Sequence, residues 1–157
     1  MRKIVSRILV VSVIVSVAAL GADNSLGTWK VNIAKSKYTP APIPLKSYTA
    51  VREAAPGGVK VTITGERADG TAINASYTAK FDGSASAVSG AGMPYDSISL
   101  KQVDANTFTY EARQASSKYH STGRTVVSKD GKTMTTTAKG TNASGQDITL
   151  TLVYDKQ

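Results

Sequence analysis

Apolar and polar residues alternate along most of the chain after residue 26, which is typical of β-strands with one buried face. In the stretch VKVTIT, Val59, Val61 and Ile63 share one face and lysine and threonine occupy the other. The same alternation recurs in AINASYTAKF at 72–81, TFTYEA at 107–112 and DITLTLVY at 147–154. Because no stretch from residue 27 onward has a convincing helical period, the pattern predicts an all-β domain.

Short turns rich in Gly, Asn and Asp separate the alternating runs along the chain. These residue types favour the tight backbone conformations of hairpins. Consecutive hairpins make neighbouring strands pair, so we expect an antiparallel meander. The pattern predicts about ten strands, near residues 27–34, 46–54, 59–66, 71–81, 84–89, 96–102, 107–115, 118–128, 132–140 and 146–156.

One segment interrupts the meander. KSKYTPAPIPLKS, at 35–47, carries three prolines in five positions. Proline lacks a backbone N–H and fixes φ, so this segment can be neither a helix nor a central strand. We expect a long, stiff connection between the first and second strands.

An open sheet of this many twisted strands would leave two unprotected edges, and closure into a barrel removes both. Closure also brings the first strand beside the last. Trp29, the only tryptophan, lies on the first strand and is expected to pack near Leu152 and Tyr154 and to close one end. The sequence therefore predicts a single antiparallel up-and-down β-barrel of about 8–10 strands.

The first 22 residues differ from the rest of the chain. Three basic residues precede an apolar run from Ile8 to Leu20, and small residues then lead into polar DNS. This is the pattern of a secretory signal peptide, residues 1–22, cleaved after Gly21 or Ala22, with the barrel domain at 23–157. The run is shorter than the roughly 20 apolar residues of a membrane span, although an uncleaved anchor is the alternative. We expect no membrane span after cleavage and a periplasmic or secreted protein of the bacterial envelope.

Composition narrows the function further. The chain has no cysteine, so disulfides, zinc–thiolate sites and cysteine nucleophiles are excluded. Three of its 19 basic residues lie in the signal peptide, which leaves 16 against 11 acidic residues and a net charge of +5 for the domain. These charges are scattered, so no nucleic-acid partner is expected.

The two ends of the domain resemble the calycin superfamily, that is, the lipocalins and fatty-acid-binding proteins. Gly27-Thr28-Trp29-Lys30 is similar to the Gly-x-Trp start of lipocalins and the GTWK start of fatty-acid-binding proteins. Leu152-Val153-Tyr154-Asp155-Lys156 is similar to the final Arg-x-Tyr-x-Lys of the latter group, with leucine in place of its carboxylate-binding arginine. Small secreted bacterial proteins with a GTWK…AKSK start also look similar. The resemblance implies a lipocalin-like barrel that binds a ligand in its lumen, and implies a ligand contact at Tyr154.

His120 and Arg124 are candidate ligand contacts. If Val126 faces inward and pairs near Met134, alternation makes both side chains point into the lumen, where a cation would attract an anionic group. A change of one residue in the hairpin at Ser116–Ser117 would instead place both on the outer face. The sequence leaves these two orientations open.

The chain contains seven tyrosines and only two phenylalanines. Tyr77 and Tyr110 share faces with apolar residues and are expected to point inward, where their hydroxyls need partners. A ligand could supply them, or neighbouring threonines and serines could. We therefore predict ligand contacts at Trp29, Tyr77, Tyr110, His120, Arg124 and Tyr154.

Catalytic motifs are absent from the sequence. It has one histidine, no nucleophile-elbow motif and no metal-ligand spacing, so we expect no enzyme, no catalytic residue, no metal site and no cofactor. The sequence favours an exported monomer that holds a small apolar or amphipathic molecule in its lumen. The alternatives are a filled barrel that binds an envelope partner and, less favoured, a lumen enzyme that uses His120 as acid or base.

Overall fold

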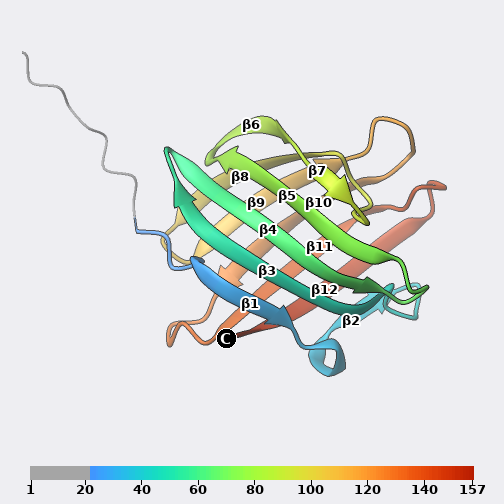
Figure 1. Cartoon of the computed structure of the whole chain (residues 1–157), viewed down its shortest axis with the longest axis horizontal. Helices are drawn as coiled ribbons and strands as arrows, with labels where there is room; N and C mark the ends of the chain where they lie inside the picture. Colours follow the sequence, from blue (N-terminus) through green and yellow to red (C-terminus); the bar gives the residue numbers. More distant parts are fainter. Residues whose placement is uncertain (1–21) are drawn as a thin grey trace, which may run out of the picture.

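The computed structural model describes residues 22–157, which form one 12-stranded antiparallel sheet curved into a nearly closed barrel (Figure 1). Apart from Ala22, the predicted signal peptide lies outside the described residues. The strands are β1 (Gly27–Val31), β2 (Lys37–Thr39), β3 (Leu45–Ala55), β4 (Gly58–Arg67), β5 (Ala72–Lys80), β6 (Asp82–Ala87), β7 (Ser89–Ala91), β8 (Ser97–Asp104), β9 (Thr107–Arg113), β10 (His120–Val127), β11 (Thr133–Thr141) and β12 (Asp147–Lys156). The all-β class and the antiparallel barrel are therefore confirmed.

Each of the ten predicted strands has a counterpart in the structure. The two additional strands, β2 and β7, are only three residues long. β2 lies in the proline-broken connection after the short 3₁₀ turn η1 (Ile33–Lys35) and pairs with β12 outside the main strand order. β7 lies in a glycine-containing stretch and pairs with β5. Neither segment has the alternation of a longer strand, so the sequence pattern did not reveal them.

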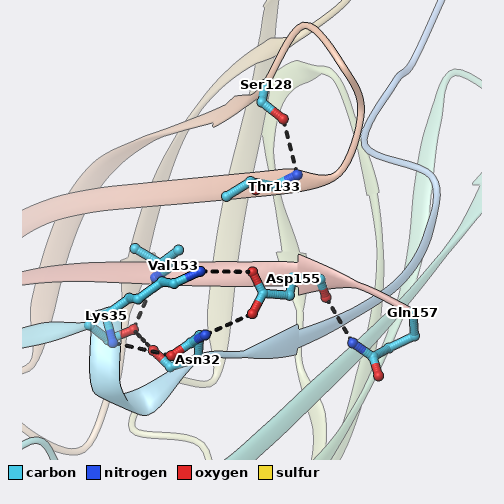
Figure 2. A network of polar contacts seen from close by, with 8 residues as sticks. Asn32, Lys35, Ser128, Thr133, Val153, Asp155 and Gln157 are labelled. Atoms are coloured by element: carbon cyan, nitrogen blue, oxygen red, sulfur yellow. Dashed lines mark hydrogen bonds and ion pairs between the residues drawn. The ribbon is translucent and has the colours of Figure 1, made fainter.

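The first and last strands of the meander meet, as predicted. β1 lies between β3 and β12, and its register places Trp29 opposite Lys156 and Val31 opposite Tyr154. Figure 2 shows how polar side chains fasten this junction at the ends of the two strands. Asn32 Nδ2 donates to Asp155 Oδ2 at 2.8 Å, and the Lys35 ammonium lies 3.7 Å from Asp155 Oδ1.

The barrel is interrupted elsewhere, between β5 and β8. The strand order begins at β6, which pairs with β8, and ends at β7, which pairs with β5. The chain bends sharply from β5 into β6, and Gly83 takes a φ of +84° there, in the left-handed region that glycine adopts without strain. We call the gap between these two sheet edges the seam.

A short segment before β1 covers one end of the barrel. Asn24 N donates to Ala105 O at 3.0 Å, and Gln102 Nε2 donates to Ala22 O at 2.9 Å. Trp29 Nε1 donates to Ser25 O at 2.8 Å, and neither Trp29 nor Ser25 has any exposed surface. We call residues 22–26 together with Trp29 the floor.

The end away from the floor is formed by β2, the proline-rich connection and the loops at 92–95 and 142–144, and we call it the mouth. In Figure 1 the start of β1 lies at the left end of the barrel and β2 at the right end. No helix among residues 22–157 is long and apolar enough to cross a membrane.

Two clusters of buried side chains line the inside. The larger one runs along β3, β4, β5 and β8 and includes Val61, Ile63 and Tyr77. The smaller one surrounds Trp29 with Val31, Val127, Met134 and Tyr154. Trp29 thus packs against the last strand, as the sequence predicted, and the space above it is left for a cavity.

Candidate ligand-binding site

The barrel encloses a cavity of about 510 Å³, within the usual range for ligand pockets. Strand alternation creates it, because the inward residues of β3, β4 and β5 include small or branched side chains such as Ala50, Val61 and Ile73. Aliphatic residues of β8 and β12, among them Leu100 and Leu150, also line the cavity. The lumen is therefore partly empty rather than filled by its own side chains.

All seven tyrosines of the chain line this cavity: Tyr38, Tyr48, Tyr77, Tyr95, Tyr110, Tyr119 and Tyr154. Some lie against one another. The rings of Tyr48 and Tyr154 meet edge to face at 6.1 Å, and those of Tyr95 and Tyr119 stack at 6.0 Å. The excess of tyrosine over phenylalanine in the sequence is thus a property of the lumen.

One glycine makes room for an inward tyrosine. Gly123 on β10 lies directly opposite Tyr110 on β9, and a Cβ at this glycine would come within 2.5 Å of the Tyr110 ring. Because a side chain at position 123 would clash, the ring can lie across the neighbouring strand and border the cavity.

Burial keeps the lumen phenols protonated. It raises the pKa of Tyr48 and Tyr95 well above the ordinary value of 10, and it also raises the pKa of Tyr77, Tyr110 and Tyr154. For Tyr77, the positive charge of Arg52 offsets part of this increase. At neutral pH these hydroxyls are therefore neutral groups that can donate hydrogen bonds into the cavity.

Three of the predicted contact residues, Tyr77, Tyr110 and Tyr154, line the cavity. Trp29 does not line it. Its ring lies in the smaller buried cluster, where it contributes to the floor on which the cavity rests. The binding role of these residues stays a prediction.

Of the two orientations that the sequence left open for His120 and Arg124, the structure has the outward one. Tyr119 and Ser121 are the inward neighbours on β10, so His120 and Arg124 lie on the outer face and neither lines the cavity, which removes the basis for the predicted ligand contacts at these two residues. The orientation depends on which of two consecutive valines faces inward. Val127, only 2% exposed, pairs with Met134, whereas Val126 is 40% exposed. Shifting the anchor by one residue reverses the orientation of the whole strand.

On the outer face, His120 joins a small polar group. Its Nε2 lies 3.0 Å from Glu111 Oε1, and the Arg113 guanidinium contacts the same carboxylate. These contacts lower the pKa of Glu111, with the hydrogen bond to His120 as the largest cause. All three side chains are well exposed, so this is an ordinary surface ion pair.

Two cavity residues that the sequence analysis did not single out are arginines. Arg52, on β3, continues the inward row of Tyr48 and Ala50, and Arg67 ends β4 at the mouth. Arg67 Nη1 donates to Gly92 O at 3.2 Å and so ties the loop at 92–95 to the barrel. The signal for Arg52 was present, since strict alternation from Ala50 places it inside.

The charge of the lumen is consequently positive. Arg52 and Arg67 border the cavity, and no Asp or Glu of the described residues does. Nor does any cluster of three or more His, Asp or Glu side chains within 22–157 form a potential metal site.

Comparison with known proteins adds little to this geometry. No family model matches the chain, and no curated protein matches it. A solved structure described as "EF1p2_mFAP2b bound to DFHBI" is similar at 11% sequence identity and a TM-score of 0.49, covering 85% of this chain and 94% of that one. The nearly closed antiparallel barrel, with Gly27-Thr28-Trp29 on its first strand, is the architecture that the sequence resemblance implied.

Proposed function

We propose that this protein is an exported binding protein that holds a small apolar or amphipathic molecule in the lumen of its barrel. The observation that carries the proposal is the cavity of about 510 Å³ behind a sealed floor. Aliphatic and tyrosine side chains dominate its wall, and a few polar groups converge in it, as in typical small-molecule sites. The signal-peptide pattern supports a periplasmic or secreted location, and we expect a monomer.

The filled-barrel alternative is less well supported. It requires a lumen packed with side chains, whereas the cavity is large enough for a small organic molecule. The lumen-enzyme alternative required His120 inside with an acid or base partner. Because His120 lies on the outer face, that specific mechanism loses its central residue. We therefore propose binding without catalysis.

The direct test is native mass spectrometry of the mature protein purified from its own periplasm or medium. We expect an additional mass that disappears on denaturation and that identifies the bound molecule. A second test uses the uncharged dye Nile red, whose fluorescence rises in an apolar environment. We expect saturable binding by the wild-type protein.

A matched pair of variants locates that binding. Ala50 is buried and lines the cavity, so Ala50→Trp should fill the lumen and weaken Nile red binding by about tenfold or more, the effect of losing about 1.4 kcal/mol. Ala85, exposed on β6, gives the control Ala85→Trp, which should bind as the wild type does. Equal dye binding by both variants, with both folded, would contradict a lumen site.

A further inference from the structure

Arg52 is an inward-facing cation without a direct counter-ion. It lines the cavity, and no carboxylate of the described residues lies within ion-pair distance of it. Its guanidinium carbon lies 5.8 Å from the centre of the Phe108 ring, within reach of a cation–π contact. The Arg52 side chain is half-buried, and where it borders the cavity no carboxylate lies beside it, so the guanidinium can accept an anionic partner there.

The floor orients this guanidinium. Arg52 Nε donates to Ser25 Oγ at 2.9 Å, and the fully buried Ser25 also binds Trp29 through its carbonyl. With Nε fixed on the floor side, the two Nη groups remain on the side that borders the cavity and the Tyr77 hydroxyl. Guanidinium Nη groups form a planar fork that matches a carboxylate.

A purely structural role for Arg52 is the competing interpretation. Ser25 Oγ and Ser25 N both bind Asp23 Oδ1, at 2.5 and 2.8 Å, so Asp23 reaches Arg52 indirectly through one serine. Asp23 Oδ2 is buried and has no hydrogen-bond partner. This relay explains how Arg52 is held, but it brings no carboxylate to the side of the guanidinium that faces the cavity.

The tyrosines indicate the rest of the ligand. The positive charge of Arg52 offsets part of the increase in the pKa of both Tyr77 and Tyr154, so the two neutral hydroxyls lie in the same part of the lumen as Arg52. Aromatic faces surround this space, among them the stacked rings of Tyr95 and Tyr119 and the edge-to-face tyrosine pair, and aromatic faces favour a flat ring over a saturated chain. A flat ring with oxygen substituents can stack on the tyrosine rings and accept their hydrogen bonds.

We propose, building on the proposed lumen-binding function, that the ligand is a small aromatic carboxylate whose acid group meets Arg52 and Tyr77 above the floor. Its ring lies among the tyrosines, and its far end points toward the mouth. The arginine of this anion site, Arg52, lies on β3. The site does not use position 152 of the last strand, which is leucine.

The test compares naphthoate with uncharged naphthamide by isothermal titration calorimetry. The two share one ring system and differ in the charge that Arg52 would recognise. We expect the wild type to bind naphthoate about tenfold or more tightly than naphthamide, as a charge-assisted hydrogen-bonded pair allows. Arg52→Met, which keeps most of the aliphatic stem of the side chain, should weaken naphthoate binding much more than naphthamide binding and so bring the ratio close to one.

Three controls make the outcome decisive. Arg124→Met removes an arginine from the outer face and should keep the wild-type ratio. Arg52→Lys retains the positive charge and should keep part of the preference for naphthoate over naphthamide. This variant replaces Arg52→Met if Arg52→Met does not fold. Decanoate, an acid without a ring, should bind more weakly than naphthoate.

Each contrary result has a distinct meaning. Equal wild-type affinity for naphthoate and naphthamide, or an unchanged ratio in folded Arg52→Met, would overturn the anion site while leaving lumen binding intact. Tighter binding of decanoate than of naphthoate would overturn the aromatic assignment. If neither naphthoate, naphthamide, decanoate nor Nile red binds, the proposed function fails together with this inference.

Discussion

At the scale of single residues, Trp29 links the floor to the barrel wall. Its ring has no exposed surface and packs with Val31, Met134 and Tyr154, and its indole nitrogen binds Ser25 O. Ser25 in turn positions Arg52. Trp29 therefore stabilises the fold and, through Ser25, indirectly orients Arg52, which we propose binds the carboxylate of the ligand.

Substitution of Trp29 should separate the contribution of ring packing to stability from that of the indole hydrogen bond. Trp29→Ala removes a fully buried aromatic ring and should lower the free energy of unfolding by about 3–5 kcal/mol. Trp29→Phe keeps most of the packing but leaves Ser25 O without its donor, which should cost about 1–3 kcal/mol. Urea unfolding followed by circular dichroism measures both values. A loss below about 1 kcal/mol for Trp29→Ala would contradict its place in the core.

Residue orientation could be predicted only in part. Tyr77, Tyr110 and Tyr154 belong to strands with several apolar anchors on one face, so their inward orientation was readable from the sequence. His120 and Arg124 follow a hairpin and precede the pair Val126-Val127, so nothing in the sequence fixed the register of β10. Arg52 was not singled out because charged residues rarely lie on the inward face of a strand. The same rarity makes its inward position a reason to propose a binding role.

At the scale of elements, four turns between consecutive strands share one arrangement. The carboxylates of Asp69, Asp82, Asp104 and Asp130 each accept a hydrogen bond from the backbone N–H two residues later, at 2.9–3.0 Å. These bonds favour the charged form, so the pKa of each of these carboxyl groups is lowered. Ionisation of these aspartates therefore stabilises the turns.

This arrangement gives the fold a pH dependence of definite sign. A carboxyl group whose pKa is lower in the folded state stabilises the fold above the unfolded pKa, about 3.9 for Asp. That contribution is lost as pH falls through the folded pKa. We therefore expect the urea midpoint to fall as pH drops below about 4.

A variant with asparagine at all four turn positions provides the comparison, because asparagine still accepts the hydrogen bond but does not titrate. Its urea midpoint should change less over the same pH range. If the two proteins lose stability equally, the turn carboxylates are not responsible, and other acids such as Glu111 must be considered.

The elements themselves were largely predictable, since regular alternation and turn residues mark ten of the twelve strands. The exceptions have a physical reason. β2 and β7 exist because longer strands, β12 and β5, offer free backbone groups beside them. Pairing of this kind depends on the tertiary structure, and a local pattern of three residues does not encode it.

At the scale of the whole molecule, we expect the seam to be the least stable part of the barrel. β6 and β7 each pair with one neighbour only, and most of their residues are exposed. By contrast, β10, β11 and β12 pair on both sides along most of their length. The length of the meander and its end motifs predicted that the barrel closes. The sequence did not predict where the seam lies, because that depends on the bend near Gly83.

Hydrogen exchange followed by mass spectrometry should reveal this difference. Amides of β6 and β7 should exchange through local opening well before those of β11, which require global unfolding. Addition of a lumen ligand should slow exchange at the loop 92–95 and along β3. Equally slow exchange in β6 and β11 would show that the seam is as stable as the rest of the barrel.

The junction of β1 with β12 also determines when β1 can complete its pairing during synthesis. Trp29 and Lys156 are register partners although almost the whole domain separates them in the chain. Such non-local pairing slows folding, because the two ends lose conformational entropy in meeting before their contacts stabilise the chain. β1 therefore lacks one of its two neighbours until residue 156 has emerged from the ribosome. A chain built this way stays incomplete during synthesis, and such a delay would keep the polypeptide unfolded for the export that we propose.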